Sequence, residues 1–205
     1  MQVTKYPQSC LLIEHERVRL VIDPGSYFTA SFDLDDLGEL DAVLVTHRHL
    51  DHIDPVLVGP LRERGIEIVG NADVADLLGE GLVRVVEDGQ RFEVAGLDAV
   101  AHDLPHVPMV DGSPGPPNTG FVLEGRLFHP GDGVEITGLR VPNVAVPICG
   151  PSISFRDAYA FVTSLGAEKV IPVHYDAFVA DPEHFARVCD LAEVIVLDDG
   201  DSTAI

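Results

Sequence analysis

A short segment at residues 43–54, VLVTHRHLDHID, constrains this chain more than any other part of its sequence. It places three histidines and two aspartates directly after an apolar run. The chain has nine histidines in 205 residues, so three of them within six positions are a strong local concentration. Buried polar groups need partners, and so dense a cluster cannot be satisfied as cheaply as one core histidine. The segment therefore predicts a buried strand that ends in a binding site.

The spacing inside this segment offers two binding points. His47 and His49 are two residues apart, so both side chains can point the same way from an extended backbone. Asp51 and His52 lie at the start of a turn into a helix and can address a second, nearby point. Imidazole and carboxylate groups are the usual ligands of zinc and similar divalent ions in open catalytic sites. One loop can therefore serve a centre of two metal ions.

Three further stretches present a histidine or an aspartate after apolar residues. The candidates are His102 and His106 in AHDLPH, Asp132 in FHPGD, and His174 after VIPV. Each has a simpler explanation, because aspartate is common in turns and a histidine can be a satisfied core residue. Their position after predicted strands favours the interpretation that they complete the same site.

The hydrophobic pattern predicts a chain of alternating strands and helices. Strands are expected at residues 10–14, 17–22, 42–45, 66–69, 82–86, 91–94, 97–100, 120–123, 126–128, 144–148, 169–173 and 193–197, and helices at 54–64, 72–78, 154–165 and 182–191. The irregular stretch 107–118 is expected to be a long loop, either functional or surface filler. Antiparallel strands followed by strand–helix alternation predict two packed sheets with helices outside.

Length and composition limit the classes of function. A chain of 205 residues with 46% hydrophobic residues predicts one folded domain, residues 1–205. The net charge of −21 disfavours DNA or RNA as a partner, without excluding a small anion. No signal peptide or membrane-spanning run is visible, and three cysteines outside CxxC pairs favour a reducing cytoplasm. We therefore expect a cytoplasmic protein with a small-molecule substrate and no membrane or nucleic-acid partner. The sequence leaves open whether it forms a homo-oligomer.

The order HxHxDH, a later histidine, Gly-Asp and a final strand-end histidine resembles the metallo-β-lactamase superfamily of hydrolases. VIDPG before the first motif and FHPGD after it strengthen the match, which covers essentially the whole chain. The sequence looks closest to the small cytoplasmic branch that includes ascorbate-phosphate lactonase-like proteins. The resemblance implies an α/β fold, a four-layer αββα sandwich of two mixed β-sheets with helices on the outer faces. It places the metals at one sheet edge.

The resemblance also implies a ligand set for two divalent ions, zinc being favoured and manganese or iron being alternatives. His47, His49 and His106 would hold the first ion, Asp51, His52 and His174 the second, and Asp132 would bridge. Counting back from Gly120, as related sequences space this ligand, favours His106 over His102. His102 is then expected behind the ligands or at the rim of the site.

The expected reaction is hydrolysis of a small-molecule ester, lactone or phosphodiester by a metal-bound hydroxide, because two divalent ions lower the pKa of a bound water to about 7. Asp51 is the candidate catalytic residue, orienting this nucleophile and passing on its proton. Four other residues are weaker candidates for supporting or substrate-facing roles: Asp23, which we expect to orient the histidine loop by hydrogen bonding, His129, Tyr175 and Asp176.

Two alternatives remain open at this point. The chain could be a metal-stabilised binding or scaffold module without turnover, or a metal-dependent oxidoreductase of the same fold. Only 41 residues separate Asp132 from His174, too few for the inserted domain of RNA-cleaving relatives. The chain also departs from related sequences near its start, where Gly-His is common and this chain has Pro7-Gln8-Ser9-Cys10. Any role tied to that histidine is therefore in doubt here.

Overall fold

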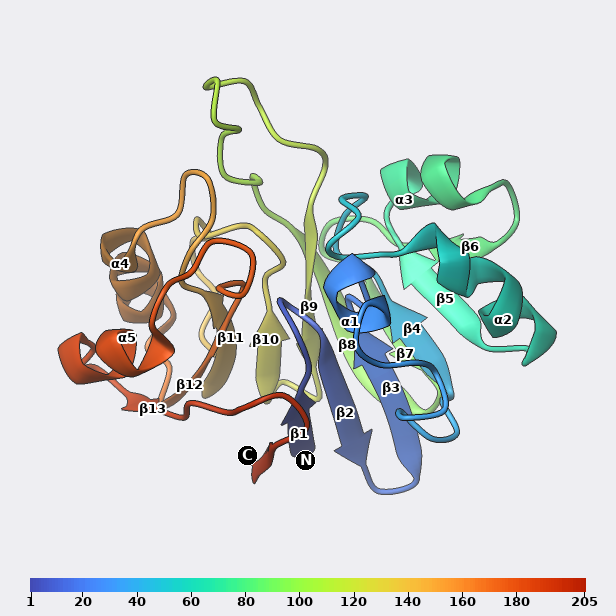
Figure 1. Ribbon diagram of the computed structural model, residues 1–205, viewed down its shortest axis with the longest axis horizontal. Coiled ribbons are helices and arrows are strands. Elements are labelled where there is room, and N and C mark those ends of the chain that lie inside the picture. Colours follow the sequence, from blue (N-terminus) through green and yellow to red (C-terminus); the bar gives the residue numbers. More distant parts are fainter.

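The computed structural model describes all 205 residues and contains two seven-stranded β-sheets (Figure 1). The first sheet has the order β14-β1-β2-β3-β4-β5-β6. Its strands are β1 (Gln2–Lys5), β2 (Leu11–His15), β3 (Val18–Ile22), β4 (Ala42–Leu44), β5 (Glu67–Gly70), β6 (Val83–Val85) and β14 (Ser202–Ala204). Strands β3 to β6 run parallel, whereas β14, β1, β2 and β3 pair antiparallel. The sheet is therefore mixed, as predicted.

The second sheet repeats this design in the order β13-β12-β11-β10-β9-β8-β7. Its strands are β7 (Arg91–Val94), β8 (Leu97–Asp103), β9 (Thr119–Leu123), β10 (Leu127–His129), β11 (Asn143–Pro147), β12 (Lys169–Val173) and β13 (Glu193–Val194). Strands β10 to β13 are parallel, and β7 to β10 are antiparallel. The carboxyl ends of parallel strands lie at the same edge of a sheet, so the residues that follow β10 and β12 lie at that same edge.

Four of the six helical elements begin at a side-chain cap. The helical elements are α1 (Ser26–Thr29), the 3-10 turn η1 (Pro55–Leu57), α2 (Val58–Glu63), α3 (Ala72–Leu78), α4 (Phe155–Leu165) and α5 (Pro182–Val188). The side chain of Asp54, which precedes Pro55, accepts a hydrogen bond from Val56 N. Ser154 forms a capping box with Asp157 at the start of α4. None of the five α-helices has the length and apolar character needed to cross a membrane.

Alternation along the strands explains why the two sheets pack together. Leu11 and Ile13 of β2 face a core of 21 buried residues that also contains Ile171 and Val173 of β12, so this core lies between the sheets. Leu12, between them, points to the other face of the first sheet. Strands buried on both faces need nearly continuous hydrophobic sequence, which is what the sequence pattern showed.

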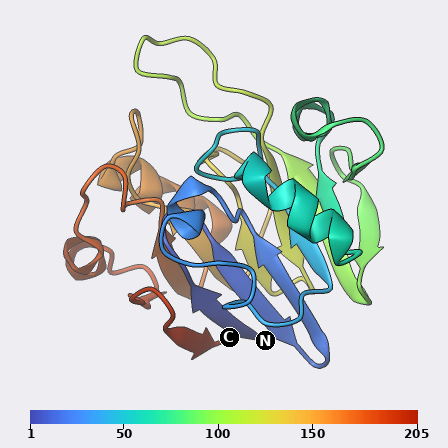
Figure 2. The ribbon, with the colours of Figure 1, turned by 45° about the vertical axis from the view of Figure 1, so that its right-hand side comes forward.

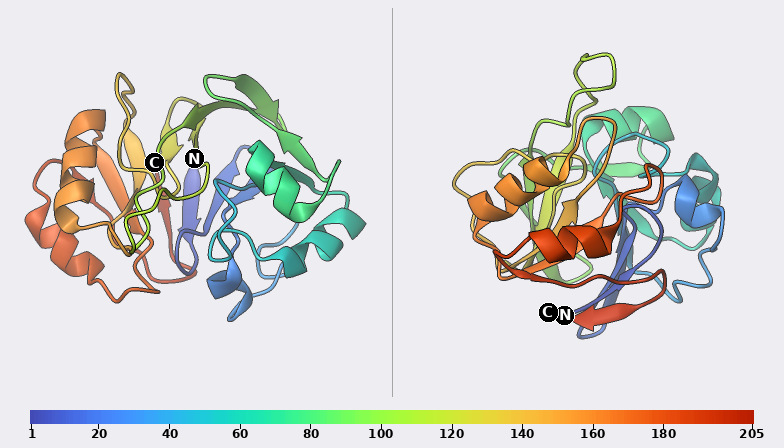
Figure 3. Two further views of the ribbon diagram at one scale, coloured as in Figure 1. Left: turned by 90° about the horizontal axis from the view of Figure 1, so that it is seen from above. Right: turned by 60° about the vertical axis from the view of Figure 1, so that its left-hand side comes forward.

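Helices cover both outer faces. Phe28, Leu61 and Val74 of α1, α2 and α3 pack on the first sheet, across which α2 lies in Figure 2. Phe161 and Phe185 of α4 and α5 pack on the second sheet. Figure 3 shows the two helical layers on opposite sides of the paired sheets. This arrangement confirms the predicted four-layer αββα sandwich.

Several predicted boundaries were wrong for identifiable reasons. The helix predicted at 182–191 ends at Val188, because Cys189 adopts an extended backbone conformation. The strand predicted at 193–197 pairs only through Glu193–Val194. The helix predicted at 54–64 is divided into η1 and α2. Strands β1 and β14 were not predicted, although they close one edge of the first sheet by pairing the two chain ends.

Candidate metal centre

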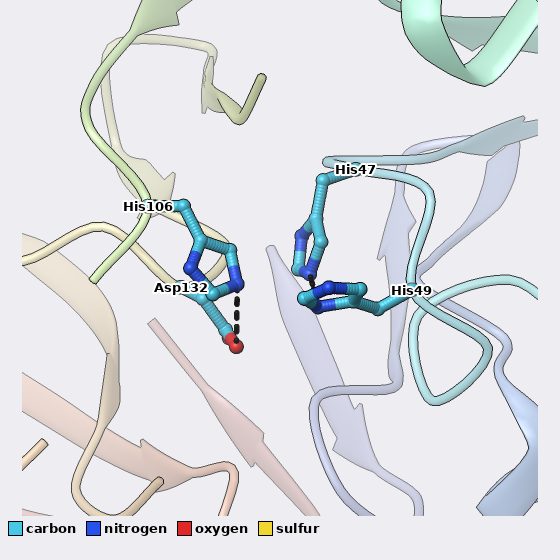
Figure 4. A group of neighbouring side chains, drawn as sticks. All are labelled: His47, His49, His106 and Asp132. Carbon is cyan, nitrogen blue, oxygen red and sulfur yellow. Dashed lines mark hydrogen bonds and ion pairs between the residues drawn. The ribbon is translucent and has the colours of Figure 1, made fainter. Parts of the chain in front are cut away.

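Loops from both sheets bring all seven predicted ligands to one edge of the molecule. His47, His49, Asp51 and His52 follow β4, while His106, Asp132 and His174 follow β8, β10 and β12. Their potential ligand atoms form two groups, each with all atoms within 4.8 Å of one another. Figure 4 shows side chains of the first group directed toward a common space from two sides.

The first group combines three imidazoles with one carboxylate. His47 Nε2 lies 3.0 Å from His49 Nδ1. The ring of His106 packs edge-on against both, with centroid separations of 4.8 and 4.9 Å. Asp132 Oδ2 lies 3.5 Å from His106 Nε2. This donor set is suited to zinc or a similar ion with an open coordination position.

The second group consists of Asp51, His52 and His174. Asp51 Oδ2 lies 3.4 Å from His174 Nε2 and 3.9 Å from His52 Nε2. Asp132 reaches this group too, because its Oδ1 is 3.2 Å from His52 Nε2 and its Oδ2 is 3.1 Å from His174 Nε2. Asp132 therefore lies between the groups, in the position that a bridging ligand needs.

Buried Asp23 holds the histidine loop in place. Its carboxylate accepts hydrogen bonds from Thr46 N at 2.8 Å and Thr46 Oγ1 at 2.7 Å, and from His52 Nδ1 at 2.7 Å. Thr46 Oγ1 in turn lies 3.1 Å from His47 Nδ1 and can accept its proton. Asp23 thus makes the contacts that we predicted for it, and they reach one histidine of each group.

Gly25, in the VIDPG segment, allows this loop to approach the neighbouring turn. A Cβ at this position would lie 2.0 Å from the backbone carbonyl of Asp51. A backbone hydrogen bond from Ser26 N to Leu50 O, at 2.7 Å, holds the two segments together. A side chain at position 25 would therefore displace the segment that carries Asp51.

Hydrogen bonds orient three of the imidazoles. His106 Nδ1 lies 2.6 Å from Val107 O, and His174 Nδ1 lies 2.5 Å from Cys149 O. Because a carbonyl oxygen can only accept, Nδ1 carries the proton in both rings. His52 Nδ1 is held in the same way by Asp23. In all three residues Nε2 is consequently the atom that faces the ligand groups.

The cluster leaves buried polar atoms without hydrogen-bond partners. Four of the six such side-chain atoms in the chain are His52 Nε2, His106 Nε2, His174 Nε2 and Asp132 Oδ1. Leaving buried polar atoms unpaired is costly, and native proteins rarely do so without a reason. All four are good metal donors directed into one space. The residues therefore fit divalent cations.

The balance of charge between the carboxylates and the imidazoles also fits divalent cations. Burial alone would lower the pKa of His174, but Asp132 and Asp51 outweigh it and raise that pKa to about 10. Burial would likewise lower the pKa of His52, yet Asp132 and Asp23 raise it well above its usual value. Burial lowers the pKa of His47, and the neighbouring His52 lowers it further. Protons on imidazoles thus balance the carboxylates where divalent cations would otherwise do so.

All five weaker candidates, Asp23 and His129 among them, lie outside the two groups. His102 lies on β8 and lines a surface pocket with Asp88 and Asp103, and its expected place behind the ligands or at the rim stays a prediction. Tyr175 and Asp176, candidates for supporting or substrate-facing roles, make supporting contacts, and a substrate-facing role for them stays a prediction. Tyr175 donates to Leu197 O at 3.3 Å, and Asp176 Oδ2 accepts from the buried Gln8 N.

His129 is fully buried and has a supporting contact. Gly131 N donates to His129 Nδ1 at 3.2 Å, so the other ring nitrogen carries the proton and donates to Ser9 O at 2.9 Å. Burial lowers the pKa of this ring, which favours the neutral form. His129 therefore ties the loop before Asp132 to the turn between β1 and β2.

Two supporting residues were not predicted from the sequence. Gln8 donates from Nε2 to Asp51 Oδ2 at 3.0 Å. Asn118 accepts from Asp132 N at 3.1 Å and donates to Pro130 O at 2.9 Å and Leu104 O at 3.3 Å. Neither lies in a metal-ligand motif. The replacement of Gly-His near residue 8 was the only available signal.

The family model described as the beta-lactamase superfamily domain matches residues 2–174. The chain belongs to the metallo-β-lactamase superfamily. Protein Rv0786c of Mycobacterium tuberculosis is 30% identical over 93% of this chain and 92% of its own length. A UPF0173 metal-dependent hydrolase of Thermococcus onnurineus is 32% identical over 80% of this chain and 81% of its own length.

A solved structure of another metallo hydrolase shows the same fold. Igni18, a metallo hydrolase from Ignicoccus hospitalis, superimposes with a TM-score of 0.81 at 24% identity, covering 98% of this chain and 97% of its own. At that identity the likeness shows the fold alone. The closer likeness to ascorbate-phosphate lactonase-like proteins stays a prediction.

Proposed function

We propose that this protein is a hydrolase that uses two divalent ions to cleave a small-molecule ester or lactone. The observation that carries this proposal is the set of unpaired, buried Nε2 and Oδ1 atoms shared between the two ligand groups. His47, His49, His106 and Asp132 would hold one ion, and Asp51, His52, His174 and Asp132 the other. Bound there, the ions would supply Lewis acidity and an activated water. Zinc suits these donors best, and manganese or iron are alternatives.

Asp51 is the proposed catalytic residue. Its side chain is 24% exposed, whereas His52, His174 and Asp132 are buried, so Asp51 is the ligand carboxylate that substrate can approach. Burial would raise its pKa, but the close approach of His174 and the charge of His52 lower it, and the carboxylate is ionised at neutral pH. An ionised carboxylate at this position can orient a nucleophilic water and accept its proton.

The rim of the site favours an uncharged substrate over a phosphodiester. Leu50, next to Asp51, is 59% exposed, and Phe178 is 42% exposed and stacks on His174 with a centroid separation of 5.8 Å. Arg48 is the only lysine or arginine among residues 43–54, and it is paired with Asp73 at 2.9 Å. Residues 104–118 and 174–181 contain no lysine or arginine. No cationic side chain from these segments is free to recognise a phosphate, and the apolar rim suits an acyl or lactone substituent.

The proposed setting is the cytoplasm, with a small molecule and neither nucleic acid nor membrane as partner. Its support is the net charge of −21 and the three unpaired cysteines, which fit a reducing compartment. Assembly of several copies is compatible with this proposal.

A substrate panel tests the proposed reaction. Protein reconstituted with zinc, manganese or iron would be assayed with a lactone, an aryl ester, a thioester and a phosphodiester. We expect the lactone or ester to turn over fastest, activity to disappear with a chelator, and metal to restore it. A protein that holds two ions but turns over nothing on the panel would be a binding module. Oxygen consumption by the iron form would instead indicate an oxidoreductase.

A further inference from the structure

Gln8 lies at the tip of the turn between β1 and β2 and is fully buried. Its φ of +64° is in the left-handed region, which residues other than glycine rarely adopt. A long polar side chain held there, away from water, needs specific partners. The turn itself is closed by a backbone bond from Tyr6 N to Cys10 O at 2.8 Å, which fixes the position of its tip.

The backbone of Gln8 holds the segment that follows β12. His174 N donates to Gln8 O at 3.0 Å, and Gln8 N donates to Asp176 Oδ2 at 2.5 Å. His174 also has a left-handed backbone, with a φ of +61°. Two uncommon backbone conformations therefore support each other at the position where the second ligand group receives its histidine.

The side chain of Gln8 joins this segment to the other sheet's ligand loop. Its Oε1 accepts from Ala177 N at 3.2 Å, while its Nε2 donates to Asp51 Oδ2 at 3.0 Å. Asp51 Oδ2 is also the oxygen that lies 3.4 Å from His174 Nε2 and 3.9 Å from His52 Nε2. The amide thus holds the oxygen of Asp51 that faces the two histidines of the second ligand group.

We propose that Gln8 is the positioning residue of the second metal site: its amide sets Asp51 Oδ2 at a fixed distance from His174 by bonding to both loops at once. The first group does not depend on it, because no hydrogen bond joins Gln8 to His47, His49, His106 or Asp132. The inference rests on the proposed two-ion centre. This chain lacks the Gly-His that is common in related sequences, and Gln8 holds Asp51 in its place.

The test compares affinities for two equivalents of Co²⁺ or Zn²⁺ in full-length protein. Gln8→Met keeps the length of the side chain and removes both amide hydrogen bonds. We expect this substitution to lower the affinity for the second ion by about 10–100-fold, as loss of a supporting residue does. The affinity for the first ion should stay within about 3-fold of the wild-type value. The Co²⁺ absorption of the second site should change as Asp51 loses its fixed orientation. Gln2→Met makes the same chemical change at an exposed position and should leave both affinities unchanged.

A double-mutant cycle separates positioning from general stability. In the Asp51→Ala background, adding Gln8→Met should lower the affinity for the second ion by a further factor of less than about 3, because the carboxylate that Gln8 positions is gone. If Gln8→Met does not fold, Gln8→Asn keeps the backbone bonds, accepts the left-handed conformation and is too short to reach Asp51. The inference would be overturned if Gln8→Met weakened the binding of both ions equally or of neither. It would also be overturned if Gln8→Met weakened binding of the second ion as much in the Asp51→Ala background as in the wild type. Wild-type protein that binds two ions but turns over nothing would refute the proposed function alone.

Discussion

The two sheets contribute to the metal centre in different ways. The first sheet supplies four ligands from one loop after β4, and that loop depends on one buried carboxylate, Asp23, through Thr46 and His52. The second sheet supplies three ligands from three loops, each with its own hydrogen-bond partner. A shared support makes several ligands vulnerable to one change, whereas separate supports confine damage to one ligand. Substitutions can test this difference directly.

The largest effect is expected where the contributions of the two sheets meet. Asp132→Ala removes the carboxylate that lies close to His106, His52 and His174. Because it belongs to both groups, we expect both ions to be weakened, by more than the roughly 100-fold upper range for a supporting residue. Metal analysis after dialysis, with turnover measured on the same samples, checks this. Retention of two tightly bound ions would show that the groups are independent.

Asp23→Asn tests the shared support. The amide cannot accept from all three donors around Asp23, so one or more buried groups lose a partner. We expect about 10–100-fold weaker binding of both ions, because Thr46 contacts His47 and Asp23 contacts His52. The free energy of unfolding should fall by about 1–3 kcal/mol in urea titrations. Asp98→Asn, at an exposed position on β8, is the matched control and should change neither quantity. An effect on one ion alone would contradict a shared support.

Asn118→Ala tests a separate support. It removes hydrogen bonds to Asp132 N, Pro130 O and Leu104 O, so the free energy of unfolding should fall by about 1–3 kcal/mol. Metal affinity should fall by about 10-fold or less, because the carboxylate itself remains. Thermal and urea unfolding with and without metal measure both effects. A loss of metal binding as large as that of Asp23→Asn would remove the distinction between the sheets.

His102→Ala should have the smallest effect. His102 belongs to neither ligand group and lies on the half-exposed face of β8. We expect a change in unfolding free energy within about 0.5 kcal/mol and unchanged metal content. His106→Ala, four residues further on, should remove a ligand of the first ion. Equal loss of metal in the two variants would show that the assignment of the third histidine is wrong.

The same difference between the sheets explains what could be predicted from sequence. Ligands in one loop form a dense local motif, so His47 to His52 were identified without any knowledge of the fold. His106, Asp132 and His174 are isolated in sequence, so only their position after predicted strands marked them, and the choice of His106 over His102 depended on resemblance. The strands of the sandwich core were recognised because burial on both faces requires continuous hydrophobic sequence. Strand β14 was missed because only β1 pairs with its backbone and its residues are largely exposed.

The supporting contacts could not have been predicted, because they depend on distance in space. Gln8 and Asp51 are 43 positions apart, and Asp51 gives no local sign that an amide will bind it. Asn118 looks like any polar residue before a strand. The contacts of Tyr175 and Asp176 were equally invisible in the sequence, although both residues adjoin or nearly adjoin His174. Both side chains turn toward Lys5.

The loop at 107–118, which rises from the molecule in Figure 1, begins and ends at fixed points. Val107 N donates to Asp132 O at 3.0 Å, and Asn118 fastens the returning chain to Leu104 and Asp132. Gly115 packs against the ring of His106, but no hydrogen bond joins residues 108–114 to a ligand side chain. We therefore expect a change in the length or sequence of that stretch to leave the metal ligands in place. Because Pro108, Gly112 and Pro114 line a pocket with His106, a library of sequences at this position would test whether the loop sets substrate preference.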